Sequence, residues 1–441
     1  MKKVCAIGGL CALMLMGHGV VGQDFSLDAE FRPRAEYREG FQKPLTTAQR
    51  PNLIVLNRTR LGASYGSEHL RVRFTLQDSR IWGATDLSPA VPFKVFEAWA
   101  QLLFTPQLSL TLGRQALAYD YNRLFATSNW TIDGKSHDLA LLRFANADMG
   151  LRADLGLAVN NPNDALAQPL YNDGLKLYRH MEFLRVEQLF ADKRLKTSMI
   201  FLSEGFQKVV VDTSIAAGKR LDGAYGRHTV GANVELNDKD FPVNALITGY
   251  YQFGRNPNTM MADPASTRTL SAYLLAAKVG CSLGQTFGAH IGADLYSGTS
   301  ATAEADNTWN KLYGSNHSHN GNIEYWRSLP QEGLIDAFAG LSAKHERLSA
   351  GLVYHLFSSQ HELRTAGCSG SGLGSELDLT LQFKLAPDVT IEGGWSTYLC
   401  NDNTRAIKNV QGQELRFAHW AYVSFTIKPK LFSYKAPKAD E

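Results

Sequence analysis

Residues 25–38 read FSLDAEFRPRAEYR, and along this stretch the two faces of the chain differ throughout. Every odd-numbered residue from Phe25 to Tyr37 is apolar or aromatic, whereas every even-numbered residue from Ser26 to Arg38 is polar or charged. A period of two is typical of a β-strand with one apolar face and one polar face. The alternation therefore predicts a long amphipathic strand in this part of the chain.

The same alternation returns in three later stretches, at residues 70–77, 229–236 and 376–384. Strands of soluble β-sandwiches are usually about 5 or 6 residues long, whereas a tilted strand that crosses a membrane needs about 9 to 11 residues. The first stretch runs well past the soluble length. Strand length therefore favours a membrane-spanning sheet.

Eighteen candidate strands can be placed along the chain, and the connections between them alternate between short and long. These strands are expected to begin near residues 24, 52, 68, 93, 107, 138, 149, 176, 194, 227, 243, 268, 285, 334, 348, 373, 388 and 414. Outer-membrane barrels have tight periplasmic turns and long external loops, and a closed sheet leaves no unpaired edge in lipid. The predicted fold class is all-β: a single antiparallel transmembrane β-barrel of about 18 strands, with short periplasmic turns, long extracellular loops and both termini in the periplasm.

A basic pair, Lys2 and Lys3, precedes a short apolar stretch over residues 4–17, and small residues follow it. This order is typical of a secretory signal peptide, and cleavage before Gln23 is the natural interpretation. We therefore expect residues 1–22 to be removed and the remaining chain to reach the outer membrane of a bacterial cell.

The charge balance excludes one class of function. The 441 residues contain 45 lysines and arginines against 42 aspartates and glutamates, which leaves no bulk positive charge for binding nucleic acid. Beyond the leader no apolar run is long enough for a transmembrane helix, which needs about 18 residues. We expect one barrel domain over residues 23–427 and a basic tail over residues 428–441.

The polar face of each strand is expected to line the lumen, because a charge that faces lipid at mid-bilayer costs about 2–4 kcal/mol. Barrels of about 16 to 18 strands leave an aqueous channel, so function depends on the residues that line it. Sixteen arginines lie between residues 24 and 200, and nine lie after them. On the first strands the predicted lumen residues are Glu30, Arg32, Arg34, Arg58, Arg60, Arg71, Arg73 and Glu97.

An arginine-rich wall lowers the barrier for anions, and guanidinium groups bind carboxylates through two parallel hydrogen bonds. The sequence therefore predicts a passive, anion-selective channel for an acidic saccharide, with no catalytic activity, cofactor or metal. An alternative stays open at this point, in which the arginines only pair with acids on neighbouring strands and solvate the lumen.

Residues 112–143 read LGRQALAYDYNRLFATSNWTIDGKSHDLALLR, and this stretch resembles the alginate-export family of outer-membrane barrels. That family has a strand that ends in Gly-Arg-Gln, an Arg-Leu and a Trp in the next loop, and an Asp that opens the following strand. The matching positions are Gly113, Arg114, Gln115, Arg123, Leu124, Trp130 and Asp138. Further stretches resemble the family in the same order, at residues 76–83, 310–326, 333–344 and 373–385.

The resemblance spans most of the chain after the leader. It implies an eighteen-stranded barrel with an electropositive conduit that moves an anionic, alginate-like polysaccharide, with outer-membrane lipid around it and periplasmic export proteins as conceivable partners. It also implies that Asp78, Arg80, Arg114, Arg123 and Asp138 lie in or near the conduit.

Other functions are compatible with a barrel of this size. The alternative to export is a general or small-solute-specific diffusion porin. An energised uptake receptor would need a plug domain before the barrel, and an enzyme would need catalytic residues at the rim; the sequence indicates neither. An adhesive barrel would need a permanently plugged lumen. Substrate, transport direction, oligomeric state and gating by the loop at residues 298–333 are left open.

Two smaller groups of residues have weaker implications. His317 and His319 could bind a metal, but two histidines on one loop are weak evidence and no metal site is predicted. Cys368 and Cys400 fall in neighbouring external loops, where a disulfide could join them, and Cys281 would then be free.

Overall fold

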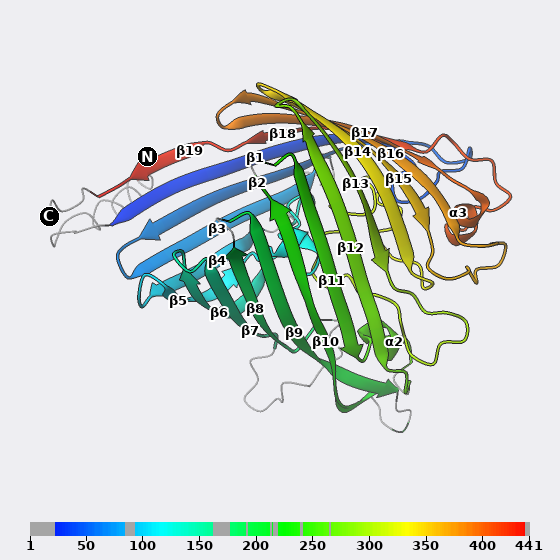
Figure 1. The fold of residues 1–441 in the computed structure, drawn as a ribbon, viewed down its shortest axis with the longest axis horizontal. Coiled ribbons are helices and arrows are strands. Elements are labelled where there is room, and N and C mark those ends of the chain that lie inside the picture. The colour runs from blue at the N-terminus through cyan, green and yellow to red at the C-terminus, as the bar shows by residue number, and fades with distance from the viewer. Residues whose placement is uncertain are drawn as a thin grey trace, which may run out of the picture.

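The computed structural model describes residues 23–83, 93–161, 177–190, 193–211, 214, 219–238, 241–263 and 266–436, so the expected leader lies outside the described residues. Their regular structure is almost entirely β (Figure 1). The described residues form nineteen strands: β1 (Asp24–Glu39), β2 (Asn52–Gly66), β3 (Leu70–Ile81), β4 (Lys94–Leu103), β5 (Leu108–Gln115), β6 (His137–Asn146), β7 (Leu151–Val159), β8 (His180–Phe190), β9 (Leu195–Val211), β10 (Lys219–Asn237), β11 (Val243–Gly254), β12 (Leu270–Leu283), β13 (Phe287–Tyr296), β14 (Leu334–His345), β15 (Leu348–Ser358), β16 (Gly372–Ala386), β17 (Val389–Leu399), β18 (His419–Ile427) and β19 (Lys430–Tyr434). They also form the short helical elements η1 (Asp120–Asn122), α2 (Pro257–Ala262) and α3 (Asp402–Ile407).

The strands from β1 to β18 pair antiparallel in sequence order, and β18 pairs back to β1. In the closing pair, Arg34 lies opposite Ser424 and Glu39 lies opposite His419. The sheet is therefore a closed barrel, which confirms the predicted all-β fold of eighteen antiparallel strands. Across the described part of the chain, no helix is long and apolar enough to cross a membrane.

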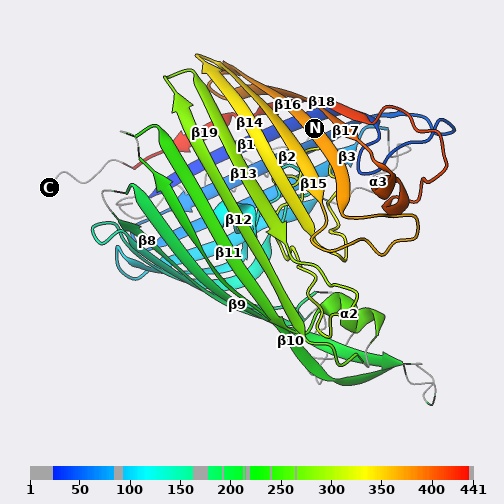
Figure 2. The ribbon, with the colours of Figure 1, turned by 45° about the vertical axis from the view of Figure 1, so that its right-hand side comes forward.

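All eighteen predicted strands are present. The start positions differ most at β10, which begins at Lys219 rather than near residue 227, and at β18, which begins at His419 rather than near residue 414. β10 begins earlier than predicted because its pairing with β9 continues as far as Lys219 and Val211. These two strands are the longest of those described, at 19 and 17 residues. Their hairpin extends beyond the rim of the barrel (Figure 2).

The connections alternate in length as the sequence predicts. Even-numbered strands are followed by short turns, as between His345 of β14 and Leu348 of β15, whereas odd-numbered strands are followed by longer connections, such as residues 297–333. Figure 1 shows the start of β1 and the strand β19 at one end of the barrel and helices α2 and α3 at the other. The short turns and the start of β1 therefore mark the periplasmic end, and the long loops mark the extracellular end.

Side chains on the barrel wall alternate between two environments. Outward residues such as Phe31, Phe74 and Ile291 are exposed by 42%, 42% and 65%. Inward polar residues such as Gln252 and Asp154 are fully buried. An apolar belt around a polar interior is the arrangement that lipid outside and water or protein inside require.

The segment after β18 departs from a simple tail. Lys430–Tyr434 forms β19, which pairs antiparallel with the start of β1, with Tyr434 opposite Phe25. The rings of Phe25 and Phe432 lie 6.2 Å apart on the outward face. Part of the segment expected to be a basic tail therefore continues the sheet at the periplasmic end.

Candidate functional site

Two long loops meet inside the barrel: the β5–β6 loop (residues 116–136) and the β13–β14 loop (residues 297–333). Phe125 and Tyr313 form a parallel β-bridge between them, and their rings stack 5.6 Å apart. The ring of Phe125 also lies 5.1 Å from that of Phe183, an inward residue of β8. The loops therefore form one packed body that narrows the lumen.

Three arginines of β1 and β2 hold the β5–β6 loop by the main-chain carbonyl groups of residues 129–131. Arg32 donates hydrogen bonds to all three carbonyl oxygens. Arg34 Nη1 donates to the middle oxygen, that of Trp130, at 2.7 Å. Arg58 Nη1 donates to the two outer oxygens at 3.1 and 3.2 Å. These predicted lumen residues do face inward, and part of their hydrogen-bonding capacity positions a loop.

The three arginines differ in their acid partners. Arg34 Nε pairs with Glu36 at 2.7 Å, and Arg58 Nε pairs with Glu30 at 2.6 Å. Arg32 has no carboxylate within 4 Å among the residues described. Its hydrogen-bond partners there are carbonyl oxygens, which carry partial negative charges only.

Arg60 is a second inward arginine with neutral partners. Its Nε donates to Gln77 Oε1 at 2.7 Å, its Nη1 donates to Asn129 Oδ1 at 3.1 Å, and its guanidinium lies 3.6 Å from the centre of the Phe96 ring. The Nη2 atom is buried and has no hydrogen-bond partner in the described part of the chain. Arg60 therefore retains one buried donor without a partner among the described residues.

The remaining predicted lumen residues of the first strands lie nearer the periplasmic end of the barrel. Arg73 forms a two-point ion pair with Asp28, and its Nε lies 4.0 Å from Glu97. Arg71 is exposed near the periplasmic end of β3. Of Arg71 and Arg73, only Arg73 is thus paired with acids among the described residues.

Four residues that the family resemblance implies for the conduit lie on the outward parity of their strands. Asp78 and Arg80 pair at 2.7 Å on β3, on the same side as the lipid-facing Phe74. Arg114 on β5 and Asp138 on β6 lie opposite each other and pair at 2.6 Å. Strict alternation turns these four side chains away from the lumen at the extracellular end of the wall.

Arg123 does lie in the lumen. It extends from the β5–β6 loop to β13, where its Nη1 and Nη2 atoms each donate to the Asp294 carboxylate at 2.7 Å. Nη1 also donates to the hydroxyl oxygen of Tyr296 at 2.6 Å. Arg123 therefore ties the loop body to the far side of the barrel.

Further lumen arginines were missed in the sequence. Arg143 on β6 and Arg152 on β7 both donate to Asp154, at 2.7 Å each, and Arg185 on β8 pairs with Asp120 of the β5–β6 loop at 2.6 Å. The alternation around Arg152 on β7 predicts an inward side chain, whereas β6 and β8 do not alternate and give no such signal for Arg143 and Arg185. The lumen arginines of β1–β3 and β6–β8 are called the arginine arc below.

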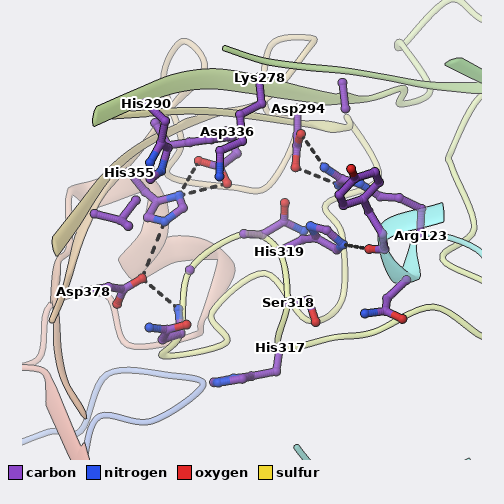
Figure 3. A pocket seen from close by; sticks show the side chains of 18 of the residues that line it. Arg123, Lys278, His290, Asp294, His317, Ser318, His319, Asp336, His355 and Asp378 are labelled. Carbon is purple, nitrogen blue, oxygen red and sulfur yellow. Dashed lines mark hydrogen bonds and ion pairs between the residues drawn. The ribbon is translucent and has the colours of Figure 1, made fainter. Parts of the chain in front are cut away.

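Acids predominate on the other side of the barrel, on β13, β14 and β16. This acid wall consists of Asp294, Asp336, Glu376 and Asp378. His355 on β15 lies among them, with Nδ1 2.8 Å from Asp336 and Nε2 3.6 Å from Asp378. Each of these contacts is shown in Figure 3.

The acid wall holds the β13–β14 loop by main-chain N–H groups. The N–H groups of residues 322–323 donate to Asp378 at 3.1 Å and to Glu376 at 2.7 Å. Gly321 precedes them with φ +80°, and a Cβ there would lie 2.4 Å from the Glu376 carboxyl group. Glycine is therefore required where the loop meets the acid wall.

A cavity of about 400 Å³ lies between the β13–β14 loop and strands β12–β16 (Figure 3). Its basic lining includes Lys278 and His290 from the strands, in addition to Arg123. Its acidic lining includes Asp336 and Asp378. The cavity is thus polar and carries both signs of charge.

Two buried loop groups next to this cavity have altered protonation. Burial and the nearby Arg123 guanidinium lower the pKa of Lys311 to about 7, and Lys311 Nζ donates to the carbonyl oxygen of Trp326 at 2.8 Å. Burial and Arg123 also lower the pKa of His319 to about 3. His319 is therefore neutral, and its Nε2 hydrogen bonds to the carbonyl oxygen of Tyr121 at 2.9 Å.

Metal and disulfide chemistry find no support in the described residues. They contain no group of three or more histidines, cysteines or acids that could hold a metal ion. His317 instead stacks on Trp130, with ring centres 3.8 Å apart. Cys368 and Cys400 are free thiols, so the disulfide considered between them is absent, and Cys281, also free, lies in β12 rather than in a turn.

A closed barrel of eighteen strands with an apolar belt, a charged lumen and inward loops defines an outer-membrane β-barrel, and it places the protein in the bacterial outer membrane. No protein-family model and no curated protein sequence matches the chain.

Solved structures of Occ proteins share the fold. OccK2 (OpdF) of Pseudomonas aeruginosa in complex with glucuronate superposes with a TM-score of 0.61 at 12% identity, over 92% of this chain and 98% of that one. OccAB1 of Acinetobacter baumannii gives 0.62 at 12% identity, over 92% and 97%. OpdK of P. aeruginosa with vanillate gives 0.57 at 10% identity, over 92% and 99%.

These neighbours overturn the resemblance to the alginate-export family, which is wrong. The stretches that suggested it cover most of β14 and β16, the end of β3 and parts of the two inward loops, which are elements that other barrels of this size can also contain. The four outward residues Asp78, Arg80, Arg114 and Asp138 agree with that correction.

Proposed function

We propose that this protein is a passive outer-membrane channel selective for small acidic solutes, with carboxylates of about the size of a sugar acid or an aromatic acid as its substrates. The observation that carries the proposal is the pair Arg32 and Arg60. Both arginines face inward beside the narrowed part of the lumen, and among the described residues both have neutral partners only. An arginine without an acid partner is free to bind a carboxylate with two hydrogen bonds.

The distribution of charge supports passage of an anion rather than permanent binding. The acid wall faces the middle of the arginine arc, so a carboxylate is drawn towards one side of the lumen. Several arginines in succession offer alternative positions, and binding at each must be weak enough for the solute to leave. Acid partners such as Glu30 and Glu36 reduce the strength of the neighbouring positions.

The two inward loops restrict the size of the substrate. The β5–β6 and β13–β14 loops are packed on each other, and Arg123 ties them to β13. A lumen narrowed by such a body suits a monomeric solute better than a polymer. Two solved neighbours hold small carboxylates, glucuronate in OccK2 and vanillate in OpdK, which favours the same solute class here.

Swelling of proteoliposomes tests this function. Vesicles that contain the protein should take up glucuronate faster than glucose, which has a similar size and no charge, and should exclude a long polyuronate. The double variant Arg32→Gln/Arg60→Gln should lose the preference for glucuronate, whereas Arg80→Gln, on the outward face, should keep it. Equal rates for glucuronate and glucose in the unaltered protein would contradict the proposal.

A further inference from the structure

The segment of the β5–β6 loop that contacts the arginine arc is a tight turn over residues 128–131. Thr131 N donates to Ser128 O at 3.1 Å, and the Thr131 hydroxyl donates to the same oxygen at 2.9 Å. Ser128 has φ +47°, which is unusual for a residue with a side chain. This backbone directs three consecutive carbonyl oxygens towards the arginines.

The turn is fixed mainly through Trp130. The Arg34 guanidinium lies 3.8 Å from the centre of the Trp130 ring, and the ring of His317 stacks on it at 3.8 Å with an interplanar angle of 6°. The rings of Tyr422 and Trp420 meet it edge-on at 4.9 and 5.8 Å. The neighbouring Asn129 is exposed to the lumen. Its side chain can therefore move without the turn being released.

Asn129 places two neutral oxygens between the arginines that lack acid partners. Its main-chain oxygen accepts from Arg32 and, at 3.1 Å, from Arg58. Its side-chain Oδ1 accepts from Arg60 Nη1 at 3.1 Å, while Arg60 Nη2 has no partner among the described residues. These are two of the positions that the oxygens of a carboxylate would occupy between guanidinium groups.

We propose that Asn129 is a specificity-determining residue that acts as an internal competitor for the solute carboxylate. Its amide oxygen occupies the anion position at Arg60 when no solute is present, and it gives way to a carboxylate, which adds a full negative charge to the hydrogen bond with the guanidinium. A solute without a carboxylate cannot displace it. This inference rests on the proposed function. It identifies the residue that determines how strongly a solute must bind the arginines in order to enter.

The test uses the full-length protein in planar bilayers, with glucuronate as the probe. The half-blocking concentration of glucuronate and the reversal potential in a salt gradient are measured for Asn129→Ala and Asn129→Asp. Removing the competitor should lower the half-blocking concentration about tenfold, because one hydrogen bond from the charged Arg60 guanidinium no longer has to be replaced. Asn129→Asp supplies a resident carboxylate of nearly the same shape, and it should raise the half-blocking concentration at least about tenfold.

Asn322 provides matched controls, because it lines the cavity on the other inward loop and its N–H contacts the acid wall rather than the arginines. Asn322→Ala should leave glucuronate binding unchanged, and Asn322→Asp, which adds the same charge to the lumen, should weaken it far less than Asn129→Asp. Equal effects of the two aspartates would overturn the inference, because the effect would then be one of lumen charge alone.

The outcomes separate this inference from the proposed function. If the unaltered protein is anion-selective and blocked by glucuronate but Asn129→Ala leaves the block unchanged, the role of Asn129 is refuted and the function stands. If the unaltered protein shows neither selectivity nor block, the function itself fails. Should Asn129→Ala not fold, the nearly isosteric Asn129→Asp still tests the inference through its predicted loss of block.

Discussion

The arginine arc and the acid wall hold the two inward loops by opposite ends of the peptide group. Arg32, Arg34 and Arg58 donate to the carbonyl oxygens of residues 129–131, whereas the N–H groups of residues 322–323 donate to carboxylates. The positively charged wall therefore binds carbonyl oxygens, and the negatively charged wall binds N–H groups. Segregated charge in the lumen has a structural use as well as an electrostatic one.

The two walls differ in what remains after the loops are bound. On the acid wall, Asp294 is paired with Arg123 and Asp336 with His355. Glu376 and Asp378 accept main-chain N–H groups instead. On the arginine arc, Arg32 and Arg60 keep neutral partners in the described part of the chain. The positive charge that a solute carboxylate can use therefore lies on the side of the arginine arc, and the predictions below test this difference.

The largest expected effect comes from breaking the link between the two sides. Arg123→Ala leaves the carboxylate of Asp294 buried and unpaired, and removal of one partner of a buried ion pair costs about 3–5 kcal/mol. We expect the free energy of unfolding in detergent to fall by that amount, and single-channel conductance to rise because the loop body is no longer tied to β13. Arg114→Ala is the control, because its outward pair is half exposed and is worth at most about 1 kcal/mol. Similar losses in both variants would contradict the assigned roles.

A somewhat smaller effect is expected where the acid wall holds its loop. Gly321→Ala places a Cβ against the Glu376 carboxyl group at a positive φ, and we expect a loss of about 1–3 kcal/mol, with noisier channel recordings. Gly370→Ala is a matched control, since φ is +65° there and no atom lies within 4 Å of the added Cβ. An equal loss in the control would mean that backbone strain, rather than the contact with the acid wall, explains the effect.

A third prediction uses pH to change the charge between the two sides. Lys311 has a pKa of about 7 in the folded protein, against an ordinary value of 10.5, and Arg123, Glu324, Asp294 and Asp336 surround it. The unfolded state binds the proton more readily between these values, so Lys311 makes stability rise with pH from about 7 to 10.5. Below pH 7 the loop body gains a positive charge, and anion selectivity should increase. Reversal potentials at pH 6 and 8 should differ in the unaltered protein and much less in Lys311→Met.

The smallest effect is expected outside the lumen. Arg80→Gln breaks an ion pair in which Arg80 is nearly half exposed on the outward face, and such pairs contribute at most about 1 kcal/mol. Conductance, selectivity and glucuronate block should all be unchanged. A clear change in selectivity would place Arg80 back in the conduit and refute the outward assignment.

The barrel could be predicted from the sequence because period two is a local property. The stretch from Phe25 to Arg38 determines its own strand and its two faces, and the same reasoning extends to Arg152 on β7. The alternation also contradicts the resemblance for Asp78 and Arg80, which share the parity of Phe74. For these two residues, the pattern of the surrounding strand predicts the side-chain direction better than a short motif does.

The contacts between loops and walls could not be predicted in the same way. A sequence pattern cannot predict the direction of the carbonyl oxygens of residues 129–131. Every residue has a carbonyl oxygen, and only the path of the chain decides where it points. Arg123 and Asp294 are 171 residues apart, and no periodicity connects them. The positions of Asn129 and Gly321 depend on the same long-range packing.

The reversal potential of the purified protein in a planar bilayer under a salt gradient tests the central claim most directly. The unaltered channel should be anion-selective, and Arg32→Gln/Arg60→Gln should shift its reversal potential towards that of a non-selective channel while the barrel stays intact. A cation-selective or non-selective current in the unaltered protein, or an unchanged reversal potential in the double variant, would contradict the account of the arginine arc as the path for small acidic solutes.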